Sequence, residues 1–342
     1  GVPERPAFRE MYAQSGEGTA PYQNYDFDVT SQAVNWLQSE AHKLDKPWVL
    51  LVSYASPHPP FTIPKRFYDL YPVEDVPMPV QWDGESRPDH PALNHTRRLD
   101  CLSKPLAEEF VRRTVAGYCG LVSHVDEQIG EVMEAARGLG MMDDMRIIYT
   151  SDHGEAAGNH GLLGKTTLYE HSLGVPLLIS GPDVPRGHEV KEIVSHVDLY
   201  DTILESTGCP LGASDHSRFG SSLWPMIDGE TIERLGFAEV HVKSTKNAAF
   251  MLRDGDLKLI YHVGAPSQLF DLGQDPLETN DLGQNKEHQA SREAMEKKLR
   301  RIVDPEAVDA HAKSDQLAHA LKYGGEAIIR NEQNIVASPP PV

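Results

Sequence analysis

The sequence has few cysteines and no long apolar run, and each absence excludes a class of protein. Its 342 residues include three cysteines, Cys101, Cys119 and Cys209, and none belongs to a Cys-x-x-Cys pair. Three cysteines cannot all pair with one another, so a disulfide scaffold is not expected. The longest apolar runs, residues 48–52 and 175–179, are strand-sized, whereas a membrane helix needs about 18 residues. We therefore expect no membrane span.

Basic residues are also scarce. Lys and Arg number 32 against 51 Asp and Glu, a formal net charge of −19. Nucleic-acid-binding proteins normally present a basic face, so this balance argues against a nucleic-acid partner. The length allows one large domain, or a large domain with a smaller one. No basic-then-apolar leader opens the chain. Because it starts on Gly1 rather than Met, we expect the natural N-terminus to be missing, which leaves the cellular compartment open.

Strands alternate with amphipathic helices in the first two thirds of the chain. We predict helices over residues 28–44, 107–138 and 197–207, strands over 48–54, 146–150 and 175–179, and loops over 1–25 and 56–105. The run 48–54 is apolar throughout, which is typical of a strand buried on both faces of a parallel sheet. This order predicts an α/β domain with a mostly parallel sheet flanked by helices and with right-handed crossovers.

After about residue 229 the pattern changes. An Asp-Gly turn separates the strand-like segments 247–252 and 257–262, which is typical of a hairpin. Two polar helices are predicted over 286–302 and 305–323. We therefore expect two domains: an α/β domain over residues 1–228 and a smaller α+β subdomain, with an antiparallel sheet and helices, over residues 229–342.

Three polar clusters follow predicted strands, where α/β folds bind their ligands. His58 lies among prolines, which fix the backbone around its imidazole. Asp152 and His153 follow the strand 146–150, and a carboxylate beside an imidazole suits a divalent metal. Lys165 carries an ammonium that suits an anionic oxygen. Each cluster also has a structural interpretation: a histidine in a rigid loop, a turn after a strand, and an exposed lysine.

The order of these clusters resembles that of the sulfatase family, within the alkaline-phosphatase-like superfamily. The shared motifs are Ser-Pro-His-Pro-Pro-Phe at 56–61, Thr-Ser-Asp-His-Gly-Glu at 150–155 and His-Gly-Leu-Leu-Gly-Lys-Thr-Thr-Leu-Tyr-Glu at 160–170. With further matching segments at 175–179, 195–204 and 269–272, the resemblance covers most of residues 25–285. The Asp-His pair is similar to that of the choline-sulfatase, iduronate-sulfatase and phosphonate-monoester-hydrolase branches.

The resemblance implies roles for the site residues. Asp152 and His153 would be ligands of one divalent metal ion, with Ca²⁺ preferred and Mn²⁺ or Mg²⁺ as alternatives. His58 would contact the sulfate and assist the leaving oxygen. Lys165 would bind a sulfate oxygen. Two further histidines, His160 and His241, are candidates for the rim of the pocket.

Two features of the family do not occur in the sequence. Its members carry an N-terminal strand that ends in paired aspartates. They also carry a Cys- or Ser-x-Pro-x-Arg motif whose first residue becomes the formylglycine nucleophile. None of the three cysteines has these neighbours, and residues 1–5 place Gly at the nucleophile position. We therefore expect residues 1–228 to be the C-terminal portion of an alkaline-phosphatase-like catalytic domain whose missing N-terminal segment supplies formylglycine, and this chain alone to be inactive.

The resemblance thus implies a sulfatase that hydrolyses a small sulfate monoester. Two alternatives stay open. The first is a phosphodiesterase or phosphonate monoester hydrolase of the same superfamily, and the second is a non-catalytic sulfatase-like fragment. No nucleic-acid or membrane partner is expected, and a homo-oligomer is an open alternative.

Overall fold

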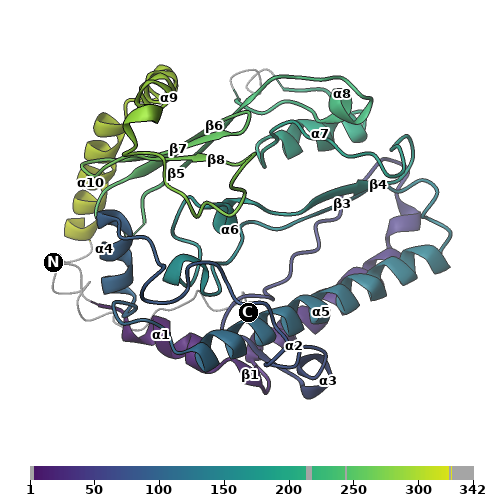
Figure 1. Ribbon diagram of the computed structural model, residues 1–342. Helices are drawn as coiled ribbons and strands as arrows, with labels where there is room; N and C mark the ends of the chain where they lie inside the picture. The colour runs from purple at the N-terminus through teal and green to yellow at the C-terminus, as the bar shows by residue number, and fades with distance from the viewer. Residues whose placement is uncertain (1–3, 213–217, 243–244, 323–324, 326–342) are drawn as a thin grey trace.

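In the computed structural model, a helical region and a sheet region flank a central pair of strands. The structure describes residues 4–212, 218–242, 245–322 and 325. Figure 1 shows the long helix α5 (Glu108–Gly138) along one side of the molecule and a four-stranded sheet on the opposite side, with the short strands β3 and β4 between them. The predicted α/β class is confirmed. Within the described residues, no helix is long and apolar enough to cross a membrane.

The helical region is built around α5, which confirms the predicted helix at 107–138. Its apolar residues, such as Leu121, recur every three or four positions and face α2 (Pro21–Ser39) and the short elements before it. Gly117 lets α5 approach closely, because a Cβ there would lie 2.4 Å from the Phe61 carbonyl oxygen. The neighbouring elements are β1 (Gly16–Glu17), β2 (Thr62–Ile63) and α3 (Lys65–Tyr68).

Three helices in the first third of the chain begin at prolines, a start signal that apolar periodicity does not detect. α2 starts at Pro21 rather than near Asp28, and the Gln23 side chain caps it by accepting from the Ala20 N–H at 3.0 Å. α1 (Pro6–Ala13) lies in a segment that was expected to be a loop. Proline suits the first turn of a helix, since its missing N–H would have no partner there. α4 (Pro91–Leu99), in the second expected loop region, begins in the same way.

The two central strands lie where they were predicted, but they run antiparallel to each other, whereas a mostly parallel sheet was expected. β3 (Ile147–Thr150) and β4 (Leu177–Ser180) pair antiparallel, with Ile147 opposite Ser180. In the described residues parallel pairing is confined to β1 with β2. The expected strand at 48–54 is absent from the described ladders, and Leu51 is 86% exposed, so its predicted burial on both faces is wrong. An apolar run reports a preference for burial, but it does not specify which strand lies beside it or in which direction.

The C-terminal half contains the antiparallel sheet, in the order β5-β6-β7-β8. Its strands are β5 (Leu235–Val240), β6 (Ala249–Asp254), β7 (Leu257–His262) and β8 (Gln268–Asp271). This confirms the predicted hairpin. One face packs on α9 (Gln289–Ile302), and the other packs on Leu168 and Tyr169 of the segment that follows Lys165. α10 (Pro305–Lys322) completes the described chain; the predicted last residue of this helix, Tyr323, lies outside the described residues.

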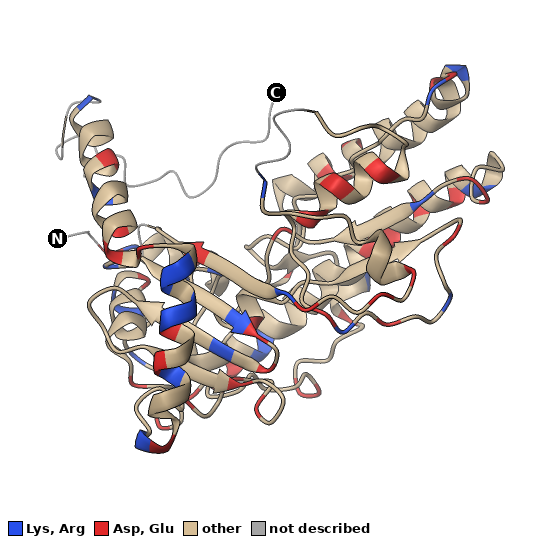
Figure 2. Cartoon of the chain, turned by 90° about the horizontal axis from the view of Figure 1, so that it is seen from above, with Lys and Arg blue, Asp and Glu red and all other residues tan. Residues whose placement is uncertain are grey.

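The remaining elements are short. They are the helices α6 (Glu170–Leu173), α7 (Asp198–Ser206) and α8 (Trp224–Ile227), and the 3-10 turns η1 (Ala41–Lys43), η2 (Asn159–Gly161) and η4 (Lys286–His288). α7 confirms the predicted helix at 197–207. The division of the chain at residues 228 and 229 stays a prediction. Figure 2, which colours the chain by charge, shows acidic residues on helices and loops throughout the molecule and a group of basic residues on α9.

Candidate active site

His58 lies in a loop whose backbone N–H groups donate hydrogen bonds to another element. The Asp26 carboxylate of α2 accepts from the Ala55 N–H at 2.7 Å and from the Ser56 N–H at 3.1 Å. The His58 Nδ1 is 2.8 Å from the Pro59 carbonyl oxygen. Because a carbonyl can only accept, Nδ1 carries a proton. In the neutral imidazole this leaves Nε2 with its lone pair.

Asp152 and His153 follow β3, as predicted, and their side chains contact each other. The Asp152 Oδ2 lies 3.3 Å from the His153 Nε2, and the Asp152 carboxylate is open to solvent. The His153 Nδ1 is 2.8 Å from the Gly154 carbonyl oxygen, so it too carries a proton. Gly154 is required here, because a Cβ would lie 2.1 Å from the His171 carbonyl oxygen.

Lys165 is half-buried, and burial lowers the pKa of its ammonium. Within the described part of the chain it has no hydrogen-bond or ion-pair partner, although the charges of Glu155 and Asp152 act on it and raise that pKa. The loop before Lys165 is held by Glu155, whose Oε1 accepts from the Gly164 N–H at 2.6 Å. A half-buried ammonium with no partner is suited to bind an anion.

The structure brings the four predicted residues into one neighbourhood. Burial lowers the pKa of His58, and the charge of Lys165 lowers it further. His153 and Asp152 also act on His58, in opposite directions. An imidazole, an ammonium and a carboxylate-imidazole pair from three separate segments therefore share one site, which is polar and partly open to solvent.

The donor set for a metal ion is incomplete in the described residues. The Asp152 Oδ2 and the lone pair of a neutral His153 face each other, which is favourable only with a cation or a second proton between them. Beyond this pair, no group of three or more His, Cys, Asp or Glu residues in the described part of the chain could hold a metal. Asp152 and His153 would therefore provide two ligands of a site that needs others.

The two rim candidates lie elsewhere. His160 is 1% exposed, its ring stacks on Tyr169 and its Nδ1 is 2.8 Å from the Gln81 Oε1. The prediction that His160 lines a pocket rim is therefore wrong, because this ring is packed in the core. His241 follows β5, 3.6 Å from the Glu239 carboxylate, and its role stays a prediction.

Sequence reasoning missed the residues that hold the site together. Asp26 is a buried carboxylate and Glu155 a partly buried one. Both accept backbone N–H groups, and Tyr12 of α1 donates to the Glu155 Oε2 at 2.9 Å. Glu155 stands in the Asp-His-Gly-Glu motif, so its position next to the site was visible. Its hydrogen bonds depend on the folded loop and have no local signal.

These features define a mixed α/β protein with a polar, anion-compatible site after its central strands. Residues 2–209 match the family model described as Sulfatase, and residues 158–304 match N-sulphoglucosamine sulphohydrolase, C-terminal. The chain belongs to the sulfatase family. Members of this family typically use a metal ion and a formylglycine.

Curated relatives and solved structures agree with this assignment. A choline-sulfatase of Rhizobium meliloti (strain 1021) is 30% identical over 92% of this chain and 64% of its own length. Arylsulfatase K of Bos taurus is 29% identical over 92% of this chain and 61% of its own. The chain thus spans less than two thirds of either relative.

The similarity in structure concerns the fold. A phosphonate monoester hydrolase from Silicibacter pomeroyi superposes with a TM-score of 0.69 at 24% identity, covering 80% of this chain and 59% of that protein. A protein solved with its substrate D-glucosamine-2-N,6-O-disulfate gives a TM-score of 0.65 at 19% identity, covering 81% of this chain and 69% of that protein.

Proposed function

We propose that this chain takes part in the hydrolysis of a small sulfate monoester. The observation that carries the proposal is the gathering of His58, Lys165 and the Asp152–His153 pair from three segments that stand in the order of the sulfatase motifs. The names of the choline-sulfatase and arylsulfatase relatives support a sulfate ester as the substrate.

Each side chain has a role that its surroundings support. The Lys165 ammonium binds a sulfate oxygen, because it is half-buried and has no protein partner in the described residues. The His58 Nε2, whose ring is held by the Pro59 carbonyl, lies on the substrate side and exchanges a proton with the leaving oxygen. Asp152 and His153 bind a divalent cation, and we favour Ca²⁺ among the three ions considered. When bound, that ion would polarise a sulfate oxygen.

The nucleophile is the part of the proposal that these side chains do not provide. The family's formylglycine forms in a Cys- or Ser-x-Pro-x-Arg motif, and this motif does not occur in the 342 residues. We therefore propose that residues 1–342 alone have no measurable turnover and bind Ca²⁺ and Mn²⁺ weakly. Tight metal binding together with turnover by this chain would contradict that part.

A second candidate is a phosphonate monoester or phosphodiester hydrolase. The superposition on the phosphonate monoester hydrolase favours it, because an anion-binding lysine and a histidine that exchanges a proton with the leaving oxygen would serve either reaction.

The test is a substrate panel with the protein as its gene encodes it. We expect 4-nitrophenyl sulfate to be hydrolysed with a higher kcat/KM than 4-nitrophenyl phenylphosphonate or bis-4-nitrophenyl phosphate. A reversed order would establish the second candidate. No turnover of any ester by folded protein with added Ca²⁺ or Mn²⁺ would leave the non-catalytic alternative.

A further inference from the structure

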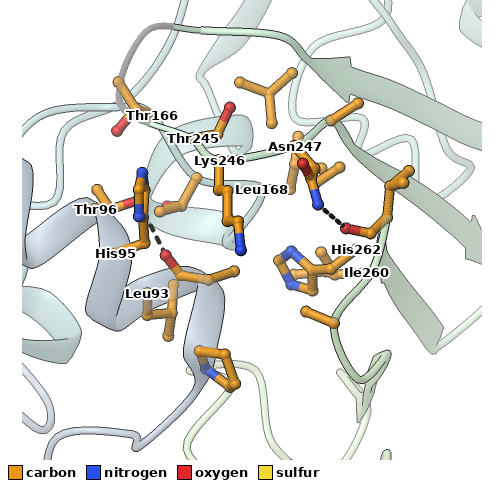
Figure 3. A pocket seen from close by; sticks show the side chains of 18 of the residues that line it. Leu93, His95, Thr96, Thr166, Leu168, Thr245, Lys246, Asn247, Ile260 and His262 are labelled. Atoms are coloured by element: carbon orange, nitrogen blue, oxygen red, sulfur yellow. Dashed lines mark hydrogen bonds between the residues drawn. The ribbon is translucent and has the colours of Figure 1, made fainter. Parts of the chain in front are cut away.

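A separate cavity of about 400 Å³ lies between the two halves of the molecule. Its walls come from α4, from the segment 166–169 and from the ends of β6 and β7, as Figure 3 shows. Thr166 in this wall directly follows Lys165, and adjacent Cα atoms are about 3.8 Å apart. The cavity therefore begins at the segment that carries the proposed sulfate-binding lysine.

The lining of this pocket is free of acidic residues. No Asp or Glu of the described chain lines it, although the whole sequence has 51 of them, while two cationic residues, Arg98 and Lys246, and two histidines, His95 and His262, do. In a chain with a net charge of −19 this is a local reversal of charge. It points to a ligand of negative charge, since a concave site lined by one sign of charge concentrates the opposite sign.

The basic groups are arranged around one space. Figure 3 shows the Lys246 side chain extending into the pocket, with the rings of His95 and His262 on either side of its ammonium. Within the described residues the Lys246 ammonium has no hydrogen-bond or ion-pair partner. Burial lowers the pKa of His95, and the charges of Arg98 and Lys246 lower it further. The positive charges of Arg98 and Lys246 therefore disfavour a proton on His95, and a bound anion would offset these charges.

We propose that this pocket binds a carboxylate or sulfate group on a small molecule, held by Lys246 and His95, and that this group belongs to the alcohol part of the ester. The second half of the proposal rests on the proposed function. It implies that the substrate is the ester of an anionic alcohol, such as an acidic sugar. A quaternary ammonium alcohol would meet Lys246 and Arg98 with no carboxylate from the described lining to balance its charge.

Calorimetry on residues 1–342 tests the pocket without any need for turnover. Glucuronate serves as the probe and choline as the cation of opposite charge. We expect glucuronate to bind, Lys246→Gln to weaken its binding about tenfold to a hundredfold, and choline not to bind. Lys191→Gln, at an exposed lysine outside the pocket, should bind as the unchanged chain does. Lys165→Ala should also keep glucuronate binding, which separates this pocket from the sulfate site.

Equal binding of glucuronate by Lys246→Gln, or equal binding of choline, would overturn the pocket proposal. A thermal melt of Lys246→Gln that matches the unchanged chain excludes misfolding as the cause of a loss. The second half of the proposal, that the bound group belongs to the alcohol part of the ester, is tested by kinetics on the protein as encoded by its gene. There Lys246→Gln should raise KM for a sulfated glucuronate and leave 4-nitrophenyl sulfate unaffected. An equal effect on both esters would refute the link, and absence of all turnover alongside intact glucuronate binding would refute the proposed function alone.

Discussion

At the scale of single residues, the surroundings of Lys165 favour a binding role over a structural one. Its ammonium is half-buried, has no hydrogen-bond partner in the described residues and acts on His58. A lysine kept for solubility would be exposed. A lysine kept for stability would have a carboxylate partner, as the buried Lys258 has in Glu170 and Glu278, each at 2.7 Å.

We therefore expect Lys165→Ala to lower kcat/KM for a sulfate ester by about 10²–10³, the usual effect of losing a contact to a charged transition-state oxygen. The free energy of unfolding should change by less than about 0.5 kcal/mol. Steady-state kinetics and urea unfolding of the protein as encoded by its gene measure the two effects. Lys104→Ala, at an exposed lysine, is the matched control. Unchanged kinetics for Lys165→Ala would assign this lysine to the surface.

Glu155 holds the loop that carries the same lysine. Glu155→Ala removes the acceptor of the Gly164 and Ala157 N–H groups and the partner of the Tyr12 hydroxyl. We expect it to lower the free energy of unfolding by about 1–3 kcal/mol, the cost of unsatisfied buried polar groups. Its kcat/KM should fall as well, because the Lys165 loop loses its anchor. Glu155→Gln keeps an acceptor oxygen and should restore most of both; failure of this rescue together with full activity of Glu155→Ala would contradict the positioning role.

These residues show how far sequence reasoning reaches into the site. His58, Asp152, His153 and Lys165 were predicted from their place after strands and from their order, and the structure gathers them. The residues that hold them were not predicted, since the hydrogen bond from the Gly164 N–H to Glu155 depends on the folded loop. The prediction that His160 lines the pocket rim was wrong, because the sequence of a motif does not show whether its histidine faces a pocket or the core.

At the scale of elements, periodicity predicted helices better than it predicted strand partners. α5 lies where its apolar spacing placed it, because a helix is defined by contacts within a few residues. The antiparallel pairing of β3 with β4 depends on how the 26-residue connection, residues 151–176, returns, and no local pattern encodes that. The apolar segment 48–54 exposes Leu51 at 86%, where a buried strand had been expected.

The exposed segment gives a prediction about solubility. Leu51→Ser should change the free energy of unfolding by less than about 0.5 kcal/mol, because this side chain buries little surface. It should reduce self-association, since exposed apolar side chains promote aggregation. Urea unfolding and light scattering at several concentrations measure the two effects. Leu37→Ser, at a leucine of α2 that is 1% exposed, is the contrasting variant, and we expect it to cost about 2–5 kcal/mol. A Leu51→Ser variant that unfolds as readily as Leu37→Ser would show that the segment is packed in solution.

At the scale of the whole molecule, the contact between the helical half and the C-terminal sheet contains several histidines that burial keeps neutral. Burial lowers the pKa of His160 to about 4 and that of His262 to about 4, and it lowers the pKa of His171 well below its ordinary range. His160 stacks on Tyr169, and His262 lies 4.6 Å from His90, measured between ring centroids. Protonation of these rings would place positive charge in a contact with little water.

Acid should therefore weaken this contact before it titrates most carboxylates. Between about pH 6.5 and 4 the unfolded chain binds protons at these histidines and the folded chain does not, so the free energy of unfolding falls as the pH falls. Each histidine with a folded pKa of about 4 contributes a loss on the order of 3 kcal/mol by pH 4 and almost none above pH 7. Urea unfolding at steps from pH 7.5 to 4.5 measures the slope. His262→Gln should flatten it, while His311→Gln, at an exposed ring of α10, should leave it unchanged. A stability that stays level or rises over this range would mean that these rings take up protons in the folded protein, and that the contact opens to water.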